Sequence, residues 1–233
     1  MKIRRFLSTK YFDQLASRSI PILAIVALIL SSYGSVGGLY LAPSDYQQGD
    51  AFRIIYVHVP SAFLSLLVYL VMGLSAIMGL IFRIKLFDMF IAGSVWPGTC
   101  FTLLALVTGC LWAKPMWGAW WVWDARLTSE LILLFLYLGV LALRSAILEP
   151  KAAAQASAVL LMLGLLNLPI IHYSVYWWNT LHQGASIRLL EPSLIAPSML
   201  YPLLAMIAAF MAYYLLVVLL HVRGEILLHT LEA

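Results

Sequence analysis

The chain has 233 residues, of which 64% are hydrophobic and 10% are charged. Its mean hydropathy is +0.96, and soluble domains carry roughly 25% charged residues. This composition excludes an ordinary soluble domain and predicts an integral membrane protein. The net charge is only +4, and we expect the lipid bilayer, not nucleic acid, to be the partner of most of its surface.

Six charge-poor intervals predict six transmembrane helices, because about 20 apolar residues are needed to cross the hydrocarbon core of a bilayer. The expected fold class is therefore an all-α bundle of six membrane-spanning helices in a single domain, 1–233. In the fourth and shortest helix we expect Glu130 in the first turn. The expected spans are about 20–41, 58–82, 89–113, 128–144, 153–178 and 198–222.

The basic residues predict the orientation, because Lys and Arg concentrate in cytoplasmic loops. Ten of the fourteen Lys and Arg residues fall on one side of the expected spans. We therefore expect both termini in the cytoplasm and the first, third and fifth loops outside it. The four basic residues on the outer side are Arg53, Lys114, Arg126 and Arg188.

No sequence motif indicates enzymatic activity. The chain contains no CxxCH, Walker, GxSxG or HExxH pattern. Cys100 and Cys110 match no zinc or redox spacing, so we expect inert thiols in the core. Any ATP-driven step would have to come from a partner protein.

Two histidines lie at the outer ends of expected spans. His58 precedes the third loop, residues 114–127, which is rich in tryptophan, and His182 follows it. A single such histidine is more often structural, but two neutral imidazoles can fill both axial positions of a haem iron. Haem propionates pair well with guanidinium groups, which Arg53 and Arg126 could supply. Arg188 is expected to extend towards the lipid headgroups. His172 lies deeper in the fifth span, where we expect a packed histidine.

The third loop, 114–127, holds the run KPMWGAWWVWDARL. Trp117, Trp120, Trp121 and Asp124 recur at i, i+3, i+4 and i+7, which predicts a short amphipathic helix with three indoles and a carboxylate on one face. Such a face suits a large flat apolar ligand, although a helix lying on the membrane shows the same spacing. The other tryptophans are expected in ordinary interfacial belts. These are Trp96, Trp112, Trp177 and Trp178.

The motif WGAWWVWDARLTSELILLFLYLG resembles the tryptophan-rich WWD signature of haem-handling membrane proteins. The stretches APSDYQQGDAFRIIYVHVP and NLPIIHYSVYWWNTLHQG resemble its CcmC branch, the haem exporter protein C family of cytochrome c maturation. The resemblance implies that His58 and His182 are axial ligands of a transiently bound haem b. It also implies a cofactor-binding surface made of Trp117, Trp120, Trp121, Trp123 and Asp124, with Arg53 and Arg126 beside it.

The resemblance also implies a function. A protein of this family is expected to present haem on the periplasmic face of the bacterial inner membrane and to deliver it to the haem chaperone CcmE. It is expected to work in an ABC-type complex with CcmA, CcmB and the small subunit CcmD, and to have no enzymatic activity itself. Two alternatives are a b-type electron-transfer cytochrome, whose paired histidines hold haem permanently, and a structural subunit that uses neither histidine.

Overall fold

The computed structural model describes residues 9–182 and 195–231. Within these residues most of the chain is helical, and no strand is present. Six helical segments are long and apolar enough to cross a membrane, which confirms the expected all-α fold with six spans. They are Tyr11–Leu41, Asp50–Phe82, Lys85–Trp117, Ala125–Ala146, Pro150–Trp177 and Pro197–Leu228.

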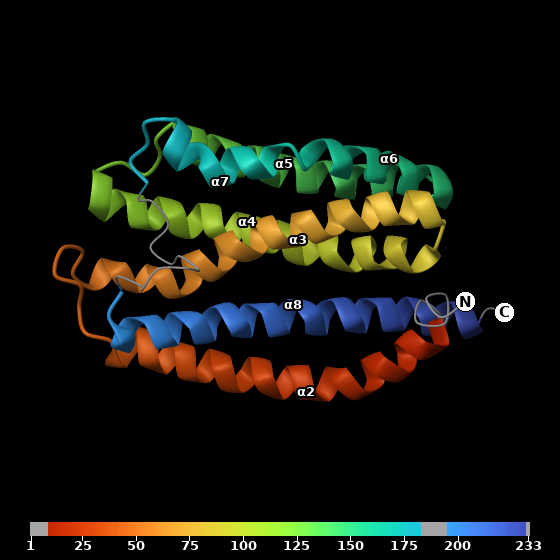
Figure 1. The fold of residues 1–233 in the computed structure, drawn as a ribbon, viewed down its shortest axis with the longest axis horizontal. Coiled ribbons are helices and arrows are strands. Elements are labelled where there is room, and N and C mark those ends of the chain that lie inside the picture. Colours follow the sequence, from red (N-terminus) through yellow and green to blue (C-terminus); the bar gives the residue numbers. More distant parts are fainter. Residues whose placement is uncertain (1–8, 183–194, 232–233) are drawn as a thin grey trace.

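The helices run along one long axis in two groups (Figure 1). Helices α2 (Thr9–Val36) and α8 (Pro197–Leu231) form a pair, so the first and last spans lie side by side. Helix α8 then contacts α3 (Ile55–Phe82) and α4 (Lys85–Trp117), which pack closely on each other. The remaining helices cover the far side of α3 and α4. They are α5 (Ala125–Ala146), α6 (Pro150–Gly164) and α7 (Asn167–Trp177).

Close contacts between glycines and tyrosines hold the central helices together. A Cβ atom on Gly98 of α4 would lie 2.2 Å from Cε1 of Tyr137 on α5. A Cβ atom on Gly164 of α6 would lie 2.0 Å from the hydroxyl of Tyr69 on α3. The two tyrosine rings meet edge to face, with centroids 5.1 Å apart. Small residues let membrane helices approach closely, and these two also make room for buried rings.

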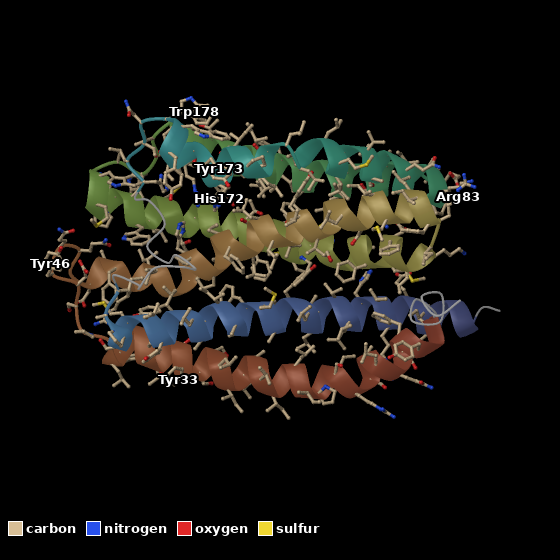
Figure 2. All side chains as sticks on the ribbon, in the orientation of Figure 1. Tyr33, Tyr46, Arg83, His172, Tyr173 and Trp178 are labelled. Carbon is tan, nitrogen blue, oxygen red and sulfur yellow. The ribbon has the colours of Figure 1, made fainter. Side chains whose placement is uncertain are left out.

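The two ends of the bundle differ in their polar contacts. At one end, Arg144 of α5 binds Asp88 of α4 through two hydrogen bonds of 2.8 and 3.2 Å. Arg223 of α8 donates to Asp13 of α2 at 2.9 Å. The other end carries the start of α3, the end of α4, the start of α5 and the end of α7. Figure 2 places Arg83 at the first end and Tyr46 at the second.

Several local expectations prove wrong. The tryptophan loop does not form an amphipathic helix, because α4 ends at Trp117 and α5 begins only at Ala125. Gly118 stops α4 with φ 76°, a left-handed conformation that favours glycine, and its N–H donates to the Lys114 carbonyl at 3.0 Å. The earlier start of α5 moves Glu130 from the first turn to the second.

Of three side chains expected in the core, two lie at the surface of the bundle. Cys100 is exposed on α4, and Cys110 is half-buried. His172 is exposed on α7 and contacts the neighbouring Tyr173 ring edge to face, at 4.8 Å between centroids (Figure 2). Arg188 lies outside the described residues.

Candidate functional site

His58 is held in one orientation by helix α4. Its Nδ1 atom lies 3.1 Å from the Ala105 carbonyl oxygen and 3.1 Å from Thr108 Oγ1. The carbonyl can only accept, and the Thr108 hydroxyl already donates to the Leu104 carbonyl at 2.6 Å. Nδ1 of His58 is therefore the donor, which leaves the lone pair of a neutral imidazole on Nε2.

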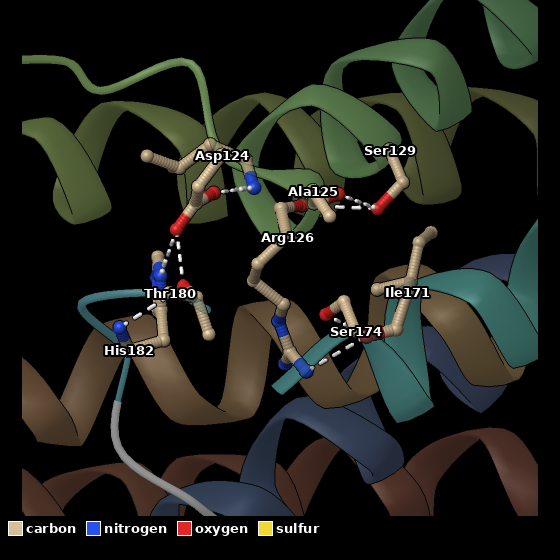
Figure 3. Close-up of polar contacts among 9 residues, drawn as sticks. Asp124, Ala125, Arg126, Ser129, Ile171, Ser174, Thr180 and His182 are labelled. Atoms are coloured by element: carbon tan, nitrogen blue, oxygen red, sulfur yellow. Dashed lines mark hydrogen bonds and ion pairs between the residues drawn. The ribbon is translucent and has the colours of Figure 1, made fainter. Parts of the chain in front are cut away.

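His182 is fixed in a parallel way by Asp124. Its Nδ1 atom lies 3.3 Å from Asp124 Oδ2, and its backbone N–H donates to Thr180 Oγ1 at 3.1 Å (Figure 3). The Thr180 hydroxyl donates in turn to Asp124 Oδ2. The Trp117 ring packs edge to face on the imidazole, with centroids 4.8 Å apart. As in His58, the contact at Nδ1 leaves Nε2 without a protein partner among the described residues.

Asp124 links this histidine to the start of helix α5. Its Oδ1 accepts the Leu127 N–H at 2.8 Å, which is an N-cap interaction. Burial raises the pKa of the Asp124 carboxyl, but the hydrogen bonds from Thr180 and Leu127 and the nearby His182 together outweigh it, so the pKa lies below its ordinary value. The site therefore holds Asp124 as a carboxylate.

His182 stays neutral at physiological pH. Burial is the main influence and lowers the pKa of its imidazole. The Asp124 carboxylate acts in the opposite direction, and Arg126 adds to the lowering. The net pKa lies below the ordinary value of 6.5, and a neutral ring is the form that binds a metal.

Both histidines line one cavity of about 40 Å³. Its wall combines two imidazoles, one cation and one carboxyl group with apolar side chains. This space is too small for a porphyrin. The lining residues are His58, Ala62, Ala105, Leu106, Arg126, Leu127, Glu130 and His182.

The two predicted arginines lie in different surroundings. Arg126 lines the cavity, and its guanidinium donates to the Ile171 carbonyl on α7 at 3.1 Å (Figure 3). Arg53 is not among the lining residues. Its guanidinium donates to the carbonyls of Gly38 and Ala42 at 2.8 and 3.0 Å, and its Nε atom to Asp50 at 3.1 Å. These bonds tie the short 3₁₀ helix Asp50–Ile54, which leads into α3, to the residues that follow α2.

The tryptophans of the loop also divide into two groups. Trp117 packs on His182, whereas Trp120 and Trp123 are 55% and 76% exposed. Trp121 is half-buried and meets Trp123 edge to face at 5.3 Å. Lys114 lies 5.9 Å from the Trp120 ring and donates to the Gly118 carbonyl at 3.0 Å. The loop thus presents two exposed indoles, and none of its tryptophans lines the cavity.

Sequence reasoning missed two residues of this region. Trp112 does not simply face lipid as part of a belt. Its Nε1 donates to Gln48 Oε1 at 3.0 Å, and its ring lies edge to face with His58 at 5.7 Å. Trp112 follows Ala105 and Thr108 by seven and four residues, so helical spacing could have placed it beside the same histidine. Glu130 could have been singled out as a carboxyl group inside an expected span.

These features define a class: a membrane protein of six spanning helices with a paired-histidine site at one end of the bundle. The sequence matches the family described as Heme exporter protein C over residues 2–233, and the chain belongs to that family. It is similar to the Heme exporter protein C of Haemophilus influenzae, with 50% identity over 207 residues, 89% of this chain and 84% of the relative. The protein of the same name from Escherichia coli K12 is 47% identical over 215 residues, 92% of this chain and 86% of the relative.

Proposed function

We propose that this protein holds haem between His58 and His182 and presents it to the haem chaperone CcmE for cytochrome c maturation. The main support is the state of the two imidazoles. Both line one cavity, and both have Nδ1 engaged by a protein group, so that Nε2 is the available ligand atom of each ring. Metal-binding histidines are oriented by such contacts at the second ring nitrogen.

The donor set fits a haem. His58 and His182 would hold the iron of a haem through their neutral imidazoles, and the bound iron would supply a Lewis-acid centre. Arg126 offers a guanidinium at the cavity wall for a propionate. The exposed indoles of Trp120 and Trp123 add apolar surface next to the site. Asp124 orients His182, and Trp117 packs on that same ring.

The distribution of charge supports a periplasmic site in the bacterial inner membrane. Four basic residues lie where helices begin or end at the end of the bundle opposite the cavity: Arg83 after α3, Lys85 at the start of α4, Arg144 in the last turn of α5 and Arg223 towards the end of α8. Lys and Arg concentrate on the cytoplasmic side. We therefore assign both termini to the cytoplasm and the paired histidines to the periplasmic end.

Membership in the haem exporter family supports a role as a transport or delivery subunit, not as an enzyme. The proposed partners are the ATPase CcmA, the membrane subunit CcmB and the small subunit CcmD. The sequence has no nucleotide-binding motif, so ATP hydrolysis in such a complex falls to a partner. An electron-transfer cytochrome is the weaker alternative, because it would hold haem permanently among packed helices. Here His58 lies in the first turn of α3, and His182 lies in the segment that follows α7.

Purified protein tests the ligand assignment directly. We expect the wild-type chain in detergent to carry haem with a low-spin optical spectrum. His58→Ala and His182→Ala should each lose most of the haem or give a high-spin spectrum. His172→Ala is the matched control, because His172 is exposed on α7 and does not line the cavity. Unchanged haem content and spin state in both ligand variants would refute the proposal.

A further inference from the structure

Glu130 is a buried acidic residue in the wall of the histidine cavity. It is 7% exposed on α5 and lines the same space as His58 and His182. Ionisable groups inside membrane proteins are costly, and they face functional sites or polar partners. The ligation of haem by two histidines does not use this carboxyl group, so its place in the cavity needs another explanation.

Several neighbouring residues hold the Glu130 side chain in place. The Ser65 hydroxyl on α3 donates to Glu130 Oε1 at 2.7 Å. The Tyr137 hydroxyl donates to the Ser65 carbonyl at 2.8 Å, and Tyr137 packs against Gly98, where no larger residue fits. The carboxyl group is therefore fixed by a layer of packed side chains that crosses three helices.

The charge of Glu130 is not neutralised by direct contact. Among the ion pairs within residues 9–182 and 195–231, none includes Glu130. Arg126 lies one helical turn away on α5 and also lines the cavity, but its guanidinium donates to the Ile171 carbonyl. In the part of the chain that the structure describes, Glu130 is thus an acidic side chain that lines the cavity without an ion-pair partner.

We propose that Glu130 stabilises the oxidised, ferric form of the haem held between the two histidines. This inference rests on the proposed function. An iron porphyrin with two neutral imidazoles has a core charge of +1 when ferric and zero when ferrous. A carboxylate in a low-dielectric site therefore favours the ferric state, and charge near a haem is one means by which a protein sets its potential.

The test is a redox titration of haem-loaded full-length protein, followed by optical absorbance with mediators. Glu130→Gln removes the charge and keeps an oxygen that can accept from Ser65. We expect an unchanged low-spin spectrum and at least a tenfold loss of preference for ferric over ferrous haem, which raises the midpoint potential by 59 mV or more for a one-electron couple. Glu130→Asp, which keeps the charge, should give a smaller increase.

Glu225→Gln is the matched control, because it removes a carboxylate from the last turns of α8 at the opposite end of the bundle. If Glu130→Gln and Glu225→Gln have the same midpoint potential and the low-spin spectrum is intact, this inference is wrong. That result would not contradict the proposed function. A wild-type protein without low-spin haem would instead refute the proposed function. If Glu130→Gln does not accumulate, infrared difference spectra of the wild-type protein, recorded between oxidised and reduced haem, replace this comparison. We expect reduction of the haem to shift a glutamate carboxylate band. An unchanged band would overturn the inference.

Discussion

The carboxylate of Asp124 holds His182 and caps helix α5 at the same time. One oxygen accepts the Leu127 N–H at 2.8 Å, and the other lies 3.3 Å from His182 Nδ1. The side chain is only 6% exposed. One residue thus couples the start of α5 to the segment that follows α7, and the orientation of the proposed ligand depends on the loop conformation.

Replacing Asp124 should separate these two roles. Asp124→Asn keeps an oxygen for the cap but weakens the contact to His182, and loss of such a contact typically lowers metal affinity by roughly 10–100-fold. Asp124→Ala should show the same loss and also lower the free energy of unfolding by about 1 kcal/mol, because the cap is removed. Haem titration and thermal unfolding in detergent measure the two effects.

Asp88→Asn is the matched control for Asp124→Asn. It removes a carboxylate that pairs with Arg144 at the other end of the bundle. We expect wild-type haem affinity in this variant. Equal haem affinity in Asp124→Asn and Asp88→Asn would show that Asp124 does not orient the ligand.

Acid should release haem through His182. Its pKa is lowered by burial from the ordinary 6.5, so below that pH the folded chain binds fewer protons than the unfolded chain. The contribution of the neutral ring to the free energy of unfolding is therefore complete above pH 6.5, and it is lost as the pH falls through the lowered pKa. The pKa of Asp124 is also lowered, from 3.8, so the carboxylate stays charged over this range. Haem retention, followed by absorbance after buffer exchange, should stay constant down to pH 6.5 and decline below it.

The Asp124→Asn variant gives this pH prediction a definite sign. The Asp124 carboxylate and its hydrogen bond raise the pKa of His182. Their loss lowers that pKa further, so the midpoint of acid release should move to lower pH although the affinity at neutral pH is weaker. His172→Ala should leave the midpoint unchanged. A midpoint that moves to higher pH in Asp124→Asn would contradict the electrostatic account.

The sequence was sufficient to predict the six helices and the shared location of the two histidines. Long apolar runs leave the backbone few alternatives to a spanning helix. With alternating spans, the start of the second and the end of the fifth must lie on one side, which places His58 and His182 together. The cavity that both residues line confirms that they share one end of the bundle.

The loop conformation and the buried contacts could not be read from the sequence. The spacing of the tryptophans suggested a helix, but Gly118 adopts a left-handed conformation that ends α4. Arg53 was expected beside the cofactor-binding surface as a partner for a propionate, yet its guanidinium is engaged by the backbone carbonyls of Gly38 and Ala42. Such contacts join residues distant in sequence and depend on how the helices pack, which a pattern along one chain does not contain.

Gly98→Ala should destabilise the protein. The added Cβ would lie 2.2 Å from Cε1 of Tyr137, a fully buried ring on α5. Overpacking of this kind costs about 1–3 kcal/mol, whereas alanine is favoured over glycine in a helix by up to about 1 kcal/mol. We expect a lower Tm for Gly98→Ala. Gly224→Ala, which has no neighbouring atom within 4 Å of the new Cβ, should keep or raise the Tm. Equal Tm values would mean that α4 and α5 do not pack as closely as described.

The exposed indoles should matter more for haem delivery than for haem binding. Trp120 is 55% exposed and Trp121 packs on Trp123 in the loop beside the cavity. Each Trp covers roughly 150–250 Å² when buried, so Trp120→Ala with Trp121→Ala removes a large apolar surface. The two proposed haem ligands, His58 and His182, remain, and so does the packing of Trp117 on His182. We therefore expect the double variant to keep part of its haem and to transfer little of it to the chaperone.

The measurement for the double variant is haem bound per molecule of this protein and haem attached to co-expressed CcmE, both normalised to the amount of protein in the membrane. The control is Trp177→Ala with Trp178→Ala, which removes two exposed indoles at the end of α7 that do not line the cavity. An interfacial belt stabilises a protein in the membrane without acting on its ligand, so the control should lower protein amount and leave transfer per molecule unchanged. If Trp120→Ala with Trp121→Ala behaves in the same way, the loop is a membrane anchor, and the surface that delivers haem lies elsewhere.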